Sequence, residues 1–289
     1  FREQGEDAFA VDWQVTDAAG RLLVDIEDWC DRRFTVTPQF THWRSHPQQA
    51  WLSDAIVLPG MPVVARWLPP QPAGFWEQGG EVWLRVAAHL MLDATERAAF
   101  YQQPATTRGD WLRGRVVAKE AVRALAQQWG QDIVAADIAI ETAASGAPQV
   151  RCPALVQPVT VSITHHGGEA AAVAAAAELR VGVDLLTGGT LDADSLSGTV
   201  LSLRERAQWM AAPADEQQRL MIRAWTAREA GAKAAGTGLE GRPDLWRLDA
   251  DIIHGPRGER AQVHWMDTPN AGCLAIATAP RHFMERKRA

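Results

Sequence analysis

Three residues in the carboxyl-terminal half have a spacing that suits chemistry. Trp225, Glu229 and Lys233 are four residues apart, and a helix would place all three on one face. An acid and a base would then lie side by side below a large apolar anchor. The same spacing also describes the ordinary stabilising Glu-Lys helix pair, which contributes roughly 0.2–0.5 kcal/mol. The pair therefore indicates chemistry if other reactive groups lie near it.

Two upstream segments supply such groups. Asp184 ends the short apolar stretch 180–184, and His165 follows the apolar stretch 161–164. A carboxylate at a strand end, a carboxylate on a helix and a nearby histidine could together hold a hard cation against a diphosphate. His166 would point to the opposite side of a strand from its neighbour, and we interpret it as a bystander.

These segments resemble the motifs of the surfactin-type 4′-phosphopantetheinyl transferases. That family has a Ser-His motif on an apolar strand, a Gly-(Ile/Val)-Asp strand end and a Trp-x-x-Lys-Glu-x-x-x-Lys helix, at about these separations. Residues 111–123 are similar to its Leu-x-Gly-Arg-x-Ala-Ala-Lys-Glu/Asp-Ala segment. The resemblance covers roughly residues 75–280. It extends to a variant fused to an iterative polyketide synthase behind a dehydratase, which implies that synthase's acyl carrier domain as partner.

The resemblance implies a reaction and a set of site residues. The 4′-phosphopantetheine arm of coenzyme A, the co-substrate, would move to a serine of an acyl carrier protein, with release of 3′,5′-ADP. Asp184 and Glu229 match the family's Mg²⁺ ligands, and Glu229 would also take the serine proton. Lys233 would pair with the departing phosphate or protonate it. The implied coenzyme A ligands are Lys233, His165, Arg115, Arg113, Lys119, and Arg228 in place of the family's lysine.

Several positions depart from the family pattern. Leu186 stands where the family often has a second acid, which predicts weaker metal binding. Ala147 replaces the basic residue of a Gly-(Lys/Arg)-Pro turn and cannot contact phosphate. Asp110 stands where some relatives have arginine, which leaves Arg108 as the substitute, and Thr164 replaces the motif serine. A second interpretation therefore stays open, a catalytically weakened module that docks a carrier protein or closes the carboxyl end of the synthase.

Two of the implied nucleotide ligands have an equally good alternative. For Arg113 and Lys119, a solvent-exposed helix face explains the charge as well as a phosphate contact does. Arg115 is the stronger candidate because it occupies the family's Gly-Arg position.

Composition excludes some classes of protein. The 289 residues predict about two domains, and 47% hydrophobic with 22% charged residues is ordinary for a soluble globular protein. A net charge of −6 argues against a nucleic-acid partner, since such proteins neutralise phosphates with clustered Lys and Arg. The three cysteines have no zinc or disulfide spacing, and no apolar run reaches the ~18 residues of a membrane span. We expect a cytoplasmic protein without a membrane partner.

The apolar periodicity and the resemblance together predict an α/β (α+β) fold. We expect two pseudo-twofold-related lobes, each packing a helix on a small, mainly antiparallel sheet, after a β-rich amino-terminal segment. Strands are predicted at 138–141, 159–163, 170–177, 245–253, 262–266 and 272–278. Helices are predicted at 81–92, 110–129, 202–210 and 215–235. The alanine-rich stretch 170–177 has helical propensity, but the resemblance places a strand there, which we adopt.

A domain boundary is expected near residue 72. Residues 9–35 alternate as a β-hairpin and resemble the closing strands of a hot-dog dehydratase, without a recognisable active site. The prolines between 58 and 72 favour a semi-rigid, extended connector. The expected units are a dehydratase remnant with its linker, a transferase domain and its two lobes, at 1–72, 73–289, about 73–178 and about 179–289.

Overall fold

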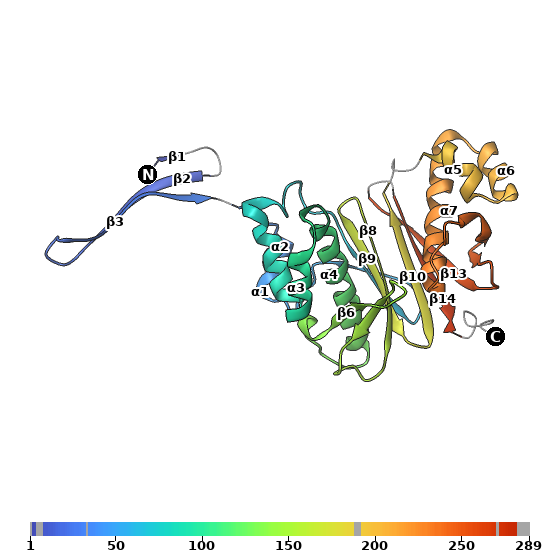
Figure 1. The fold of residues 1–289 in the computed structure, drawn as a ribbon, viewed down its shortest axis with the longest axis horizontal. Helices are drawn as coiled ribbons and strands as arrows, with labels where there is room; N and C mark the ends of the chain where they lie inside the picture. The colour runs from blue at the N-terminus through green and yellow to red at the C-terminus, as the bar shows by residue number, and fades with distance from the viewer. Residues whose placement is uncertain (1, 4–7, 33, 188–191, 270–271, 282–289) are drawn as a thin grey trace.

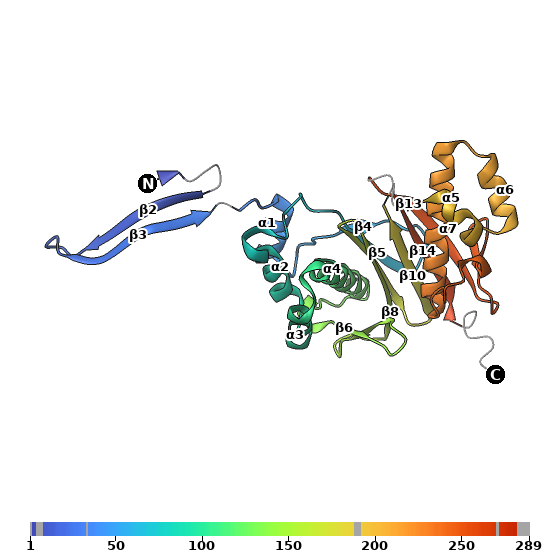
Figure 2. The same ribbon diagram turned by 45° about the horizontal axis from the view of Figure 1, so that its top comes forward.

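The computed structural model describes residues 2–3, 8–32, 34–187, 192–269 and 272–281. Two long helices and two antiparallel sheets form its body (Figures 1 and 2). The first sheet consists, in order, of β4 (Asp54–Ile56), β5 (Val63–Leu68), β9 (Glu169–Ala176) and β8 (Val159–His166). The second consists, in order, of β10 (Leu179–Leu186), β14 (Cys273–Pro280), β13 (Arg260–Asp267), β12 (Ile252–His254) and β11 (Arg247–Asp249).

Each sheet carries one long helix on its outer face. Helix α4 (Ala105–Gln128) packs on the first sheet, and α7 (Ala214–Ala235) packs on the second. A third hydrophobic cluster joins the inner faces of the two sheets, through residues such as Val173 of β9 and Val183 of β10. The expected α/β fold of small antiparallel sheets with packed helices is therefore confirmed.

Shorter elements surround these layers. Beside α4 lie α1 (Pro38–Ser45), α2 (Gln78–Met91), α3 (Ala94–Gln102) and the hairpin of β6 (Ala139–Thr142) and β7 (Pro148–Arg151). Beside α7 lie α5 (Ala193–Val200) and α6 (Leu203–Ala211). Short 3₁₀ turns occupy Ala135–Asp137 and Pro243–Leu245. None of the described helices combines the length and hydrophobicity needed to cross a membrane.

The alanine-rich stretch forms a strand, as expected. Its position between other strands explains why it does not form a helix despite the helical propensity of alanine. Strand β9 lies between β5 and β8 and is covered on both faces. Ala172 and Ala174 face the cluster under α4, whereas Ala171 and Ala175 face the second sheet. Small side chains let both layers approach closely, so packing outweighs the propensity of alanine for helix.

The expected connector over 58–72 is wrong, because residues 63–68 form strand β5 inside the first sheet. The prolines lie before and after this strand, so none of them removes a hydrogen bond from its ladder. Upstream, Phe40 and Trp43 of α1 are fully buried in the cluster under α4. We therefore place residues 38–72 with the first lobe.

Buried charges on α4 hold this upstream segment. The Glu120 carboxylate is fully buried and accepts hydrogen bonds from Trp43 Nε1 at 3.1 Å and from Leu52 N and Ser53 N at 2.8 Å. Arg123 Nη1 donates to Pro47 O at 3.1 Å. Because buried charges must be satisfied, these contacts fix α1 and β4 against α4.

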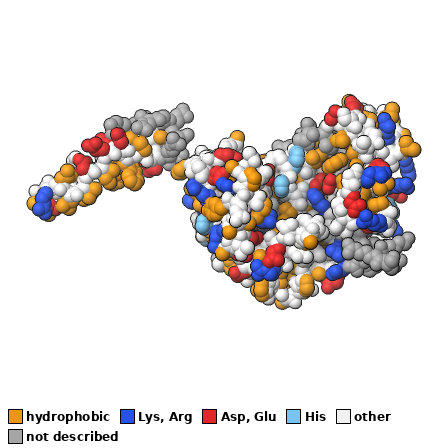
Figure 3. Space-filling view, viewed as in Figure 1, with side chains coloured by type: hydrophobic (Ala, Val, Ile, Leu, Met, Phe, Trp, Pro, Cys, Tyr) orange, Lys and Arg blue, Asp and Glu red, His pale blue; other side chains and the backbone are white. Residues whose placement is uncertain are grey.

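The amino-terminal strands extend away from the lobes (Figures 1–3). They are β1 (Arg2–Glu3), β2 (Ala8–Thr16) and β3 (Leu22–Arg32), paired antiparallel in that order. Trp13, Leu23 and Trp29 are each more than half exposed, and a hairpin of this kind is marginally stable alone. Its interpretation as a dehydratase remnant stays a prediction.

Candidate active site

A glycine brings the carboxylate strand against the long helix of the second lobe. A Cβ on Gly182 of β10 would lie 1.9 Å from Ala230 O and 2.6 Å from Ala234 N of α7. Only the absence of a side chain permits this approach. Asp184 follows two residues later on the same face of the strand and thus also faces α7. Lys233 Nζ donates to Asp184 Oδ1 at 2.7 Å and to Val183 O at 3.1 Å.

Glu229 completes this group one helical turn before Lys233. Its half-buried carboxylate makes no hydrogen bond or ion pair within the described part of the chain. Burial, and next the charge of Asp184, raise the pKa of Glu229, while Lys233 opposes them. Burial also raises the pKa of Asp184 against the opposing effect of Lys233. Two carboxylates therefore share one lysine, which favours an additional cation between them.

The donor set fits magnesium with few protein ligands. Mg²⁺ in proteins takes one or two carboxylates and completes its shell with water and substrate phosphates, and Asp184 and Glu229 supply that number. Among the described residues no group of three or more His, Cys, Asp or Glu side chains is placed to bind a metal. Leu186 instead packs with Ile222 and Cys273 in a hydrophobic cluster, so its position supplies no third oxygen.

A second group of predicted residues gathers where α4 approaches the end of β8. A Cβ on Gly114 would lie 3.1 Å from Ile163 Cγ2 and 3.8 Å from His165 Cδ2, so the helix passes close to the strand at this glycine. His165 and Arg115 both line a pocket of about 350 Å³ beside it. The Arg115 guanidinium lies 3.7 Å from the centre of the Trp111 ring, which fixes its direction. Its buried Nε has no hydrogen-bond acceptor in the described part of the chain.

The electrostatics of His165 connect the two groups. Partial burial lowers the pKa of His165, and so do the charges of Arg113 and Lys233, while Asp110 raises it. Arg113 itself forms an ion pair with Asp110. The imidazole is therefore neutral near pH 7 and sits among positive charges, a setting that suits a phosphate anion.

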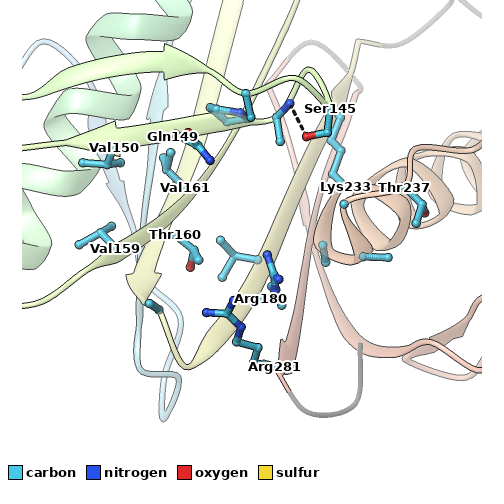
Figure 4. Close-up of a pocket in the computed structure, with 18 of the residues that line it drawn as sticks. Ser145, Gln149, Val150, Val159, Thr160, Val161, Arg180, Lys233, Thr237 and Arg281 are labelled. Carbon is cyan, nitrogen blue, oxygen red and sulfur yellow. Dashed lines mark hydrogen bonds between the residues drawn. The ribbon is translucent and has the colours of Figure 1, made fainter. Parts of the chain in front are cut away.

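A cleft of about 1090 Å³ runs between the lobes (Figure 4). The first lobe contributes β7, β8 and the turn at Ala147, and the second contributes β10 and the end of α7. Lys233, Arg180 and Arg281 reach into this space from the second lobe. Sequence reasoning did not anticipate either arginine. One signal was present for Arg180, which precedes Gly182 by two residues and so shares its strand face.

Lys119 is not available to a ligand, contrary to expectation. Its side chain is fully buried, forms an ion pair with Glu96 and donates to Met91 O at 2.7 Å. Helices α2 and α3 cover this part of α4. Lys119 therefore neither reaches a phosphate nor lies on an exposed helix face, so both expectations for it are wrong.

Arg228 and Arg108 also serve the scaffold. Arg228 is fully buried, and its Nη2 donates to both carboxylate oxygens of Glu205, at 2.9 and 2.7 Å. It precedes Glu229 by one residue and therefore faces α6 instead of β10. Arg108 pairs with Glu81 of α2 at 2.9 Å. Neither arginine lines the cleft or the smaller pocket described above.

Replacing Arg228 tests this reassignment. We expect Arg228→Ala to lower the free energy of unfolding by about 3–5 kcal/mol, because it leaves a cavity and removes the cationic partner of Glu205, whose carboxylate keeps, among the described residues, only the bond from Ser202 N. Binding of the coenzyme A that the resemblance implies should change little in the protein that folds. Urea denaturation and a binding titration measure the two quantities. Weaker binding at unchanged stability would return Arg228 to the ligand set.

Part of the chain matches a known protein family. Residues 180–277 match the family model of the 4′-phosphopantetheinyl transferase superfamily. The match begins in β10 and ends in β14, so it contains Asp184, Glu229 and Lys233. His165 and Arg115 lie upstream of it. No curated protein matches the chain.

Proposed function

We propose that the protein transfers the 4′-phosphopantetheine arm of coenzyme A to a serine of an acyl carrier protein domain. The observation that carries the proposal is the ion pair of Lys233 with Asp184 across β10 and α7, with Glu229 within electrostatic reach of both, inside the matched region. For the partner we propose a carrier domain of a polyketide synthase, on the resemblance described above. The product is the holo carrier, and 3′,5′-ADP leaves.

The reaction forms one bond and breaks one. The serine Oγ bonds to the β-phosphorus of coenzyme A, and the bond from that phosphorus to the bridging oxygen breaks. The bridging oxygen leaves with 3′,5′-ADP. Glu229 takes the serine proton, a role its raised pKa favours because it brings the carboxylate closer to neutral pH. Lys233 lies in the cleft and stabilises the charge that develops on the departing phosphate.

Asp184 and Glu229 would hold magnesium, which neutralises the diphosphate and orients the leaving group. Asp184 is the more buried carboxylate of the pair and is held by Lys233. The contact with Lys233 stabilises the charged form of Asp184 and fixes its carboxylate before the substrates bind. Without an acid at position 186, we expect a higher magnesium requirement than a site with three carboxylates would show.

His165, Arg115 and Arg113 form the proposed phosphate contacts on the nucleotide side. His165 and Arg115 line one pocket, and Arg113 lies within electrostatic reach of His165. Ala147 lies at the main cleft without a charge, which lowers the number of phosphate contacts. We expect modest affinity for coenzyme A as a result.

Coenzyme A binding should bring a proton onto His165. Its pKa is lowered in the free protein, and a phosphate beside the ring would raise it. Proton uptake on binding is therefore expected at pH values between the free and bound pKa. Titration calorimetry in buffers of different ionisation enthalpy measures the uptake, and His165→Gln should abolish it. An equal binding enthalpy in all buffers, at every pH at which the free protein keeps His165 neutral, would contradict a phosphate contact.

Transfer of a fluorescent pantetheine arm to carrier domains tests the proposed function. We expect a labelled carrier band in a denaturing gel, dependent on a divalent cation. The alternative function, a docking module, is favoured by the apolar packing of Leu186. Co-purification of an unlabelled carrier with the protein, with no label transferred, would support that alternative.

A further inference from the structure

Side chains of β8 accept hydrogen bonds from backbone amides of the segment that contains β10, and these bonds join the edge strands of the two lobes. Strands β8 and β10 lie beside each other as the edges of the two sheets. Ser162 Oγ accepts from Val183 N at 3.1 Å, and Thr164 Oγ1 accepts from Leu185 N at 3.3 Å. His166 Nδ1 accepts from Thr187 N at 3.2 Å. We refer to Ser162, Thr164 and His166 as the interlobe ladder.

The ladder gives His166 a role that sequence reasoning did not assign. Because Nδ1 accepts from a backbone amide, the proton of the neutral ring lies on Nε2. Thr187 Oγ1 is also 2.7 Å from Nδ1. His166 therefore holds the end of β10, while His165 on the opposite side of β8 lines the smaller pocket.

Thr164 differs from the other two members of the ladder. Its hydroxyl accepts from Leu185 N and lies 3.3 Å from Asp184 Oδ1, to which it donates its single proton. Thr164 and Asp184 are both buried. Asp184 Oδ1 is thus held by Lys233 of the second lobe and by Thr164 of the first.

We propose that Thr164 is a positioning residue that orients the Asp184 carboxylate for cation binding. The inference rests on the proposed function, in which Asp184 holds magnesium. Two donors from different directions fix the rotation of a carboxylate better than one, and such supporting hydrogen bonds commonly govern metal affinity. Because one donor belongs to the first lobe, the cation site is complete only when the two lobes are in register.

Ser162 provides the matched control. It is buried on the same strand and bonds the same partner strand, but within the described part of the chain its hydroxyl bonds Val183 N and not Asp184. Ser162→Ala and Thr164→Val each remove one bond of the ladder, so both should lower the melting temperature in the absence of metal by about 2–6 °C. Only Thr164→Val also removes the bond to Asp184. Thr164→Ser keeps the hydroxyl and serves as the rescue variant.

Two measurements separate orientation from general stability. The first is the magnesium concentration that half-saturates the transfer rate at saturating coenzyme A. The second is the rise in melting temperature with magnesium in the presence of coenzyme A and without carrier. We expect Thr164→Val to raise the half-saturating concentration by about 10-fold in both. Ser162→Ala and Thr164→Ser should stay within about threefold of the wild type.

Several results would overturn the inference. Equal half-saturating magnesium concentrations for Thr164→Val and Ser162→Ala would show that Thr164 only joins the two lobes and does not orient Asp184. A raised KM for coenzyme A at an unchanged magnesium constant would place its hydroxyl on the nucleotide. Should Thr164→Val not fold, Thr164→Ala removes the same hydroxyl with less change of shape, and the same criteria apply. Failure of the wild type to transfer or to be stabilised by magnesium would instead refute the proposed function itself.

Discussion

Glu229→Gln is expected to lower kcat/KM for transfer by about 1000-fold or more, because it removes both a cation ligand and the proposed base. Stability should rise slightly. Burial and Asp184 raise the pKa of Glu229, so its ionised form opposes folding once the pH exceeds the value in the unfolded chain. At neutral pH the amide removes that cost. Steady-state kinetics and thermal melting measure the two opposite changes.

Glu216 on the same helix is the matched control for this variant. It lies near the start of α7 and pairs with Arg219 at 3.3 Å, outside the proposed site. Glu216→Gln should leave both transfer and melting near the wild-type values, since exposed ion pairs contribute about 1 kcal/mol or less. Transfer by Glu229→Gln within about tenfold of the wild type would remove Glu229 from the mechanism.

Gly182→Ala is expected to lower the free energy of unfolding by about 3 kcal/mol or more, near the upper end of overpacking costs. The added Cβ would meet Ala230 O at 1.9 Å, and a backbone carbonyl cannot rotate away as a side chain can. Strand β10 and helix α7 must separate to accept it. That separation would also move Lys233 from Asp184, so transfer should fall in the protein that still folds. Urea denaturation and kinetics of the folded fraction measure both effects.

Gly198 offers a control glycine in the same lobe. Its added Cβ would have its nearest atom, Arg206 Nη1, at 3.9 Å, and it lies within helix α5. Gly198→Ala should therefore be neutral or stabilise by up to about 1 kcal/mol. If the two alanine variants had equal stability, close packing of β10 on α7 would not explain the site.

The sequence predicted which residues share a face better than it predicted what covers that face. Helical spacing placed Glu229 and Lys233 together, and the strand-end position placed Asp184 where α7 could meet it. Lys119 and Arg228 carried charge at positions with a family precedent. Both are buried against an acid of the preceding helix, Lys119 against Glu96 of α3 and Arg228 against Glu205 of α6. Spacing along one element holds no information about such partners.

The misplaced connector has a similar cause. Proline density predicted an extended segment, and residues 63–68 are indeed extended, but they pair on both sides within the first sheet. Pairing partners more than a hundred residues away are invisible to local composition. The contact of Thr164 with Leu185 and Asp184 was hidden for the same reason, since it joins the side chains of one lobe to the other.

The central claim is tested most directly by intact-mass spectrometry of a purified apo carrier domain incubated with the protein, coenzyme A and magnesium. The account predicts a mass gain of one phosphopantetheine arm per carrier, with an equal amount of 3′,5′-ADP released. The gain should disappear with a chelator and with Glu229→Gln, and persist with Glu216→Gln. Absence of any gain across several carrier domains, those of polyketide synthases included, would contradict the transferase and favour the docking module.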